Sequence, residues 1–193
     1  TSNTLTDAPI TFSGNNSNFA GEITTTELNL PSSGKIDWAN GDARIIEGEV
    51  GGYSLSFEVY NGVAALERVL LLEKSMRATF AGDVIIKTAL LSNQENTTVD
   101  TGTETVAEVP TATYTAAFFD FVIKKGLNVR SGTVYACHNG DTTPLIQFTE
   151  TSTQDLGDTS DVVLIVNYSS PNMRLRATVA SDGWSIKSLI RGI

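Results

Sequence analysis

The chain has 193 residues, with 22 acidic and 13 basic side chains and a net charge of −9. It is long enough for one domain or two small ones, and its single cysteine, Cys137, excludes an intramolecular disulfide framework. The longest apolar runs, Val69–Leu72 and Val162–Val166, are too short to cross a bilayer, so we expect no membrane insertion.

The charge is unevenly distributed along the chain. Residues 1–112 carry 15 acidic and 6 basic side chains, whereas residues 113–193 carry 7 of each. An acidic first half repels phosphates, so we expect no nucleic-acid partner. Thr, Val, Ile, Gly and Asn are plentiful, which favours strands and turns and predicts an all-β fold.

Residues 1–91 consist of short strand-like pieces separated by Gly, Asn and Ser. Such pieces cannot build a deep core from one chain, and we expect their apolar faces to pack against copies of the chain. A phrase recurs within them: "FAGEITTTELNL" begins at Phe19 and "FAGDVIIKTALL" at Phe80. Residues 63–78 are ambiguous, because Leu66, Val69, Leu70 and Met76 fall near one helical face. The pattern by itself slightly favours a helix there.

Residues 92–112 are polar, Thr-rich and poor in large apolar side chains, so we expect a linker or an extended strap. Residues 113–193 then show a denser pattern, from which we predict a sandwich of antiparallel strands. Six strand-like runs are separated by turn residues: 113–123, 128–137, 144–151, 162–168, 173–180 and 184–190.

Two of these runs show the clearest burial signals. The run 162–168, "VVLIVNY", is mainly apolar and is bounded by turn residues, so it fits a central strand. In 173–180, apolar and polar residues alternate with a period of two, which is typical of a half-buried strand. The basic residues Arg174 and Arg176 would share an exposed face with Lys187 and Arg191 if the last two strands are neighbours.

The order of phrases in the first half resembles the distal shaft of bacteriophage tail fibres and related virion appendages. The matching positions are the turn Asn40–Arg44, the strand Leu66–Leu70 and the closing phrase Ala78–Val84, and Ser17–Ile23 matches the closing phrase of a preceding unit. The C-terminal stretch also resembles the end domains that follow such shafts. The segment "LLLEKSMR" departs from the pattern, because the family usually has a Gly- or Ser-rich turn there.

The resemblance implies a trimeric intertwined β shaft over residues 1–91, a linker over 92–112 and a C-terminal β-sandwich knob over 113–193. It implies that each Phe of the repeated phrase packs towards the axis of a homotrimer, that the Gly permits a tight turn, and that 63–78 forms strands, with a short helix still open. Closure between chains removes exposed sheet edges.

Catalysis is not expected. His138 is the only histidine, and Cys137 beside it would face the opposite side of a strand, so the two cannot easily act as base and nucleophile. We interpret them as a small core cysteine beside a turn histidine. Three copies of His138 could meet on a trimer axis and bind a metal, but nothing specific indicates this, and we expect no metal and no cofactor.

Pairs of carboxylates are candidate catalytic groups, because glycan cleavage needs two such groups across a sugar bond. Asp37 with Asp42, and Glu47 with Glu49, are close in sequence, but solvated strand faces explain them better.

The resemblance therefore implies a non-enzymatic tail-fibre distal region on the virion surface, outside the cell. Its partners would be two further copies, other virion proteins and a bacterial surface receptor, either a glycan or an outer-membrane protein. Loops on a rigid scaffold carry most recognition, and the loop His138, Asn139, Gly140 and Asp141 is the predicted receptor contact. A capsid or neck decoration fibre, a tailspike-like depolymerase and a bacterial adhesin fragment remain alternatives, since fold does not fix function.

Overall fold

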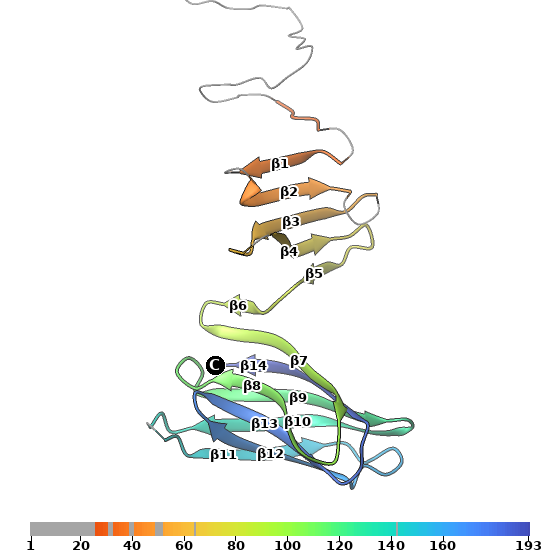
Figure 1. Cartoon of the computed structure of the whole chain (residues 1–193), viewed down its shortest axis with the longest axis vertical. Coiled ribbons are helices and arrows are strands. Elements are labelled where there is room, and N and C mark those ends of the chain that lie inside the picture. Colours follow the sequence, from red (N-terminus) through yellow and green to blue (C-terminus); the bar gives the residue numbers. More distant parts are fainter. Residues whose placement is uncertain (1–25, 31–32, 39–40, 49–51, 64, 142) are drawn as a thin grey trace, which may run out of the picture.

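A computed structural model describes residues 26–193 except 31–32, 39–40, 49–51, 64 and 142. The described chain is all-β, and its strands pair antiparallel in three sheets (Figure 1). The strands are β1 (Lys35–Trp38), β2 (Ala43–Glu47), β3 (Leu55–Tyr60), β4 (Leu66–Leu72), β5 (Ala78–Phe80), β6 (Val84–Ile86), β7 (Ala89–Val99), β8 (Gly102–Pro110), β9 (Ala116–Lys125), β10 (Asn128–His138), β11 (Ile146–Ser152), β12 (Val162–Ser169), β13 (Asn172–Val179) and β14 (Trp184–Gly192).

The N-terminal sheet, β1 to β5, is a meander in which each strand pairs with the next along the chain. Its strands lie across the long axis of the molecule, one below another, and lead into the C-terminal part (Figure 1). The register places Ile36, Ile45, Phe57, Leu70 and Phe80 in one row across all five strands. We call this side the apolar face of the N-terminal sheet.

The opposite face of the N-terminal sheet is charged. Its register aligns Asp37, Arg44, Glu58 and Arg68, which alternate in sign across β1 to β4. Arg44 Nε donates to Asp37 Oδ1 at 2.6 Å, and its terminal nitrogen lies 3.9 Å from Glu58. Cross-strand pairs of opposite charge stabilise a sheet, so this face stays in register without a covering layer.

Residues 66–72 form strand β4 rather than a helix. Pairing with β3 and β5 on its two sides outweighs the modest helical pattern, since a strand satisfies its backbone groups on both neighbours. Where the family has a Gly- or Ser-rich turn, this chain turns through 73–77, with Met76 at a φ of 64° and Arg77 paired to Glu73 at 2.9 Å.

The C-terminal part is a sandwich of two sheets, ordered β11-β10-β9-β14-β7-β6 and β12-β13-β8. The six runs predicted over 113–193 are confirmed as β9 to β14. The inward faces of both sheets form one buried cluster, and the apolar side of the period-two pattern on β13 lies within it. The largest fully buried side chains include Trp184, Phe119, Phe121, Ile123, Met173, Leu175, Ile186 and Ile190.

Residues 92–112 are not the expected linker or strap, because 92–99 belong to β7 and 102–110 to β8, in the two opposing sheets. Its polar composition concealed the strands. Gln94 on β7 both donates to and accepts from the backbone of Glu108 on β8, at 2.9 and 2.8 Å, and Asn96 donates to Glu104 at 2.8 Å. Polar residues can therefore bridge the two sheets because their hydrogen bonds are satisfied.

Two further expectations about the sandwich are corrected. The run 162–168 is the edge strand β12, not a central one; Val163 is 56% exposed on its outer side. The four basic residues do not share a face, since β13 and β14 belong to different sheets. Each instead has a local partner: Arg174 with Glu108, Lys187 with Glu95, Arg191 with Asp120, and Arg176 with the Thr103 carbonyl.

The repeated phrase can be followed at its second copy only, since Phe19 lies outside the described residues. Phe80 ends β5 and is 52% exposed in the single chain. Gly82 lies in the bend between β5 and β6 without a positive φ, whereas Lys87, between β6 and β7, has a φ of 59°. No helix in the described part of the chain could span a membrane.

Candidate functional site

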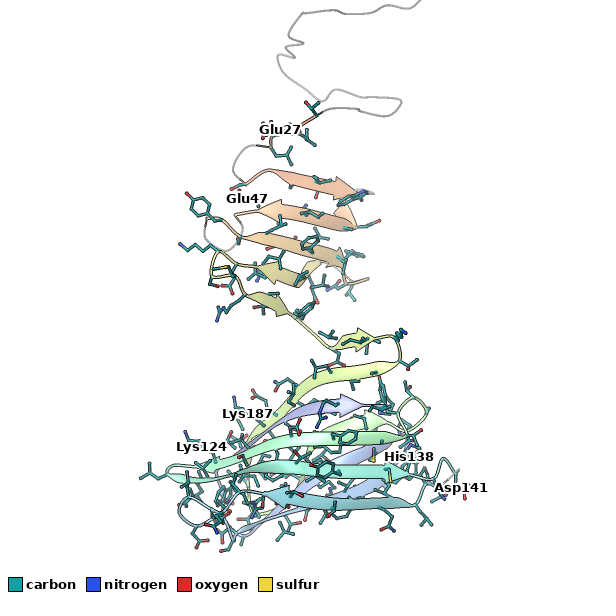
Figure 2. All side chains as sticks on the ribbon, turned by 180° about the vertical axis from the view of Figure 1, so that it is seen from behind. Glu27, Glu47, Lys124, His138, Asp141 and Lys187 are labelled. Atoms are coloured by element: carbon teal, nitrogen blue, oxygen red, sulfur yellow. The ribbon has the colours of Figure 1, made fainter. Side chains whose placement is uncertain are left out.

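The predicted contact loop His138–Asp141 follows β10 at one end of the sandwich, and Lys124 lies at the other end (Figure 2). His138 is buried, at 8% exposed, and both ring nitrogens are bonded. The Gly140 N–H donates to Nδ1 at 3.0 Å, so Nε2 carries the proton and donates to the Tyr114 carbonyl at 2.9 Å. His138 therefore holds the loop in place.

The other three residues of the loop, Asn139 to Asp141, differ in what they do: two shape the turn and one projects outward. Asn139 Oδ1 accepts from the backbone N–H groups of Asp141 and Leu145, at 3.4 and 3.1 Å, and so shapes the turn. Gly140 has a φ of 75°, which other residues rarely adopt. Asp141 is exposed and points away from the sandwich (Figure 2). Of the four predicted residues, Asn139, Gly140 and Asp141 are exposed and His138 is buried.

The expected pair of core cysteine and turn histidine is reversed. Cys137 is the exposed member and His138 the buried one. The two side chains still point to opposite faces of β10, as the strand alternation requires. Because both ring nitrogens of His138 are engaged with the backbone, this histidine is not placed as a base for Cys137.

Two of the candidate catalytic carboxylates, Asp37 and Glu47, bond to neighbours in and beside the N-terminal sheet. Asp37 accepts from Arg44 and lies 3.3 Å from Lys35, and the hydrogen bond from Arg44 is the main cause that lowers the pKa of Asp37 below its usual value. Glu47 accepts the Ser33 N–H at 2.8 Å. Glu49 lies outside the described residues. Asp37 is therefore an ion-pair partner of Arg44 and Lys35.

A groove on the outer face of the six-stranded sheet is the most developed candidate site. Its volume is about 400 Å³. Strands β9, β10 and β11 line it, and its far end reaches the residues that flank the His138–Asp141 loop. The lining residues are Ala116, Phe118, Tyr135, Ala136, Cys137, Gln147, Phe148 and Thr149. We call it the aromatic groove.

The sheet register explains why these side chains meet. Phe118 on β9 is paired with Tyr135 on β10, and Tyr135 is paired with Thr149 on β11, so the three lie in one row. The rings of Phe118 and Tyr135 meet edge to face, with centroids 5.8 Å apart and planes at 84°. This is a favourable arrangement for two aromatic rings.

An ion pair borders the aromatic groove. The Arg191 guanidinium lies 4.8 Å from the centre of the Phe118 ring, and it contacts the Asp120 carboxylate at 3.2 and 3.3 Å. Asp120 also accepts from Thr133 Oγ1 at 2.6 Å. The two charges thus neutralise each other beside the aromatic rings.

The sequence pattern alone does not predict this groove. The signal was present in "AAFFDFV", where alternation sends Phe119 and Phe121 inward and therefore Phe118 outward. An outward aromatic on a strand is not by itself diagnostic, because single exposed apolar residues are common. The groove becomes visible only from the cross-strand register, which places Tyr135 beside Phe118.

No group of histidine, cysteine or carboxylate side chains within the described residues is arranged to hold a metal ion.

Comparisons with known proteins add little to this picture. No family model matches the chain, and no curated protein matches it. One solved structure that resembles it is the tailspike protein of Acinetobacter baumannii phage AM24, at 11% identity and a TM-score of 0.37. The match covers 54% of this chain and 26% of that one.

Proposed function

We propose that the chain is the distal region of a bacteriophage tail fibre, a structural protein on the virion surface that recognises the host and mediates adsorption. Three copies assemble through the N-terminal sheet, and the sandwich presents its loops and outer face to a bacterial surface receptor. Other virion proteins carry the assembly. No catalytic step belongs to this function.

The observation that carries the proposal is the apolar face of the N-terminal sheet. No other described part of the chain forms a second layer against it, and several of its large side chains are exposed in one chain: Ile36 by 40%, Trp38 by 49%, Val59 by 43% and Phe80 by 52%. A single sheet needs a partner on its apolar side to be stable. Contiguous apolar surface of this kind is typical of protein interfaces.

The opposite face of the same sheet supports an assembly with a defined orientation. The row of Asp37, Arg44, Glu58 and Arg68 needs no apolar partner, because its charges alternate in sign across the strands. Copies packed through their apolar faces would therefore keep the charged faces outward. A hollow of about 720 Å³ on the apolar side, lined in part by Leu28, Ile36, Ile45 and Leu55, would be filled in such an assembly.

Light scattering on the purified protein tests the assembly. A mass of three chains that persists in mild detergent without heating supports it, whereas a monomer at micromolar concentration rules it out. The trimer is then incubated with a panel of bacterial cells. Saturable binding to a subset of strains is expected for a receptor-binding fibre, whereas a trimer that binds no strain indicates a decoration fibre.

Release of reducing sugars from purified surface polysaccharides separates the proposal from the depolymerase alternative. We expect no release above that from heat-denatured protein. If the native protein released reducing sugars, the depolymerase alternative would take the place of the proposed non-catalytic function.

A further inference from the structure

We propose that the aromatic groove binds an uncharged saccharide unit of a bacterial surface glycan. This site would carry the recognition step of the proposed function. The bacterial source of the glycan rests on that proposed function, whereas the class of ligand is argued from the groove itself. It names the binding face of the sandwich and the chemical class of its ligand.

The shape of the groove fits a sugar ring. A pyranose has an apolar C–H face and a rim of hydroxyl groups, so it needs an apolar surface beside polar side chains. Phe118 and Tyr135 supply the apolar surface, and their edge-to-face contact fixes both rings before a ligand arrives. Tyr135 is 42% exposed, so its ring is accessible from solvent.

The wall of the groove is almost wholly apolar, and the polar side chains that border it come mainly from β11. Gln147 and Thr149 line the groove from the strand next to β10. An amide offers two donors and an acceptor, and a hydroxyl offers both functions. A few placed polar groups around an apolar surface are the usual composition of a small-molecule site, and about 400 Å³ lies within the usual range of such clefts.

The charges decide between a neutral and a charged ligand. The nearest cation, Arg191, is engaged by the Asp120 carboxylate and stacked on Phe118. The lining residues themselves carry no charged side chain. Residues 113–193, which supply every lining residue, carry 7 acidic and 7 basic side chains, so no net charge there attracts a charged ligand. Neutral hexoses and N-acetylhexosamines fit these conditions, whereas phosphate, nucleic acid and acidic capsules do not.

The position of the groove suits a polymer. It lies on the open face of a sheet, with walls made by strand side chains rather than by a lid. A segment within a longer glycan can therefore lie across it without threading. Single sites of this kind bind weakly, and several copies on one fibre would convert weak binding into avidity.

Binding is measured first on an array of bacterial surface polysaccharides, and then by titration with a neutral oligosaccharide from the strongest hit. We expect binding to neutral glycans. Tyr135→Ala should weaken it about tenfold or more, as loss of an aromatic anchor does, and Thr149→Arg should abolish it by filling the groove. Val122→Ala, on the same outer face of β9 but outside the groove, is the matched control and should bind like the parent protein.

The sole cysteine gives a readout that does not depend on affinity. Cys137 lines the groove and is exposed, so a maleimide reports on this site alone. Labelling should be fast in the free protein, and the oligosaccharide should slow it. Circular dichroism and thermal melting confirm that each variant is folded.

Three outcomes would overturn the inference. The first is no binding of the parent protein to any neutral glycan at millimolar concentration. The second is glycan binding that Tyr135→Ala and Thr149→Arg leave unchanged. In that case the glycan site lies elsewhere on the protein, and the proposed receptor-binding function still stands. The third is a Cys137 that is protected in the free protein and released on dissociation, which makes the groove an interface between copies. A failed cell-binding assay with intact glycan binding would instead count against the proposed function.

Discussion

At the scale of single residues, the structure separates anchors from accessible groups within the same loop. His138 and Asn139 use their side chains to organise backbone turns, whereas Asp141 projects outward. A similar anchor joins two distant turns: Asp182 accepts from both the backbone and the hydroxyl of Thr101, at 2.7 and 2.5 Å, and Asp100 accepts the Gly183 N–H at 3.0 Å. These polar contacts fix loop ends that have little apolar surface to bury.

The first prediction concerns His138. His138→Ala removes the partner of the buried Tyr114 carbonyl, and we expect it to lower the free energy of unfolding by about 1–3 kcal/mol. Urea unfolding followed by tryptophan fluorescence measures the change. Asp141→Ala serves as the control and should change stability by no more than about 0.5 kcal/mol, as surface substitutions usually do. Equal effects of the two variants would contradict an anchoring role for His138.

The second prediction concerns the pH dependence at Asp182. The hydrogen bonds from Thr101 lower the pKa of Asp182 below its usual value. A carboxyl with a lowered pKa stabilises the fold above its ordinary pKa, near 4, and loses this contribution as the pH falls through the folded-state value. Asp182→Asn should therefore be less stable than the parent protein at pH 6, with the gap narrowing towards pH 2–3.

Paired urea titrations at pH 6 and pH 3 test this dependence. Asp83→Asn, just before β6, is the control for a general charge effect. A gap that stays constant between the two pH values would show that the Asp182 carboxylate does not provide the stabilisation.

At the scale of elements, the N-terminal sheet and the sandwich satisfy their strands in different ways. The sandwich buries apolar side chains between two sheets, with Gln94 and Asn96 bonded across the gap. The N-terminal sheet has one layer in the single chain, so register depends on cross-strand pairs on its charged face. Arg44 is central there, because it lies between Asp37 and Glu58 in the row.

The third prediction tests that row. Arg44→Gln removes the 2.6 Å contact to Asp37 and leaves the buried carboxylate of Glu58 with one cation fewer. Amide hydrogen exchange should speed up in β1 to β3 by about tenfold or more, with little change in β9 to β14. Lys35→Gln is the matched control; its side chain is 49% exposed, and such a pair contributes little. If Arg44→Gln and Lys35→Gln changed the exchange rates in β1 to β3 by the same amount, the charged row would not be a stabilising element.

At the scale of the whole molecule, the elongated arrangement places an exposed apolar sheet beside a self-contained sandwich (Figure 1). The sandwich has its own core and can fold within one chain. The N-terminal sheet needs a partner, and the proposed trimer supplies it from identical copies. Stability of the first part is then linked to protein concentration, whereas stability of the second is not.

The fourth prediction separates these parts. Phe80→Asp places a charge on the apolar face and should convert trimers into monomers at micromolar concentration, as measured by light scattering. The melting temperature of the sandwich should change little. Thr79→Asp is the matched control, because the side chain of Thr79, next to Phe80 on β5, points to the opposite face of the sheet. This variant should remain trimeric. Dissociation by both variants would indicate a general effect of added charge.

The sequence by itself determined the all-β class, the six strands of 116–192 and the two-sided character of β13. These features depend on local alternation and turn residues, which are readable within a few positions. Only the tertiary structure showed that the polar segment 92–112 joins the sandwich, that β12 lies at an edge, and that Arg174 and Arg191 occupy different sheets. It also brought Phe118 and Tyr135 together. Such pairings join residues that are far apart in the chain. They depend on strand register and sheet order, which no local sequence pattern encodes.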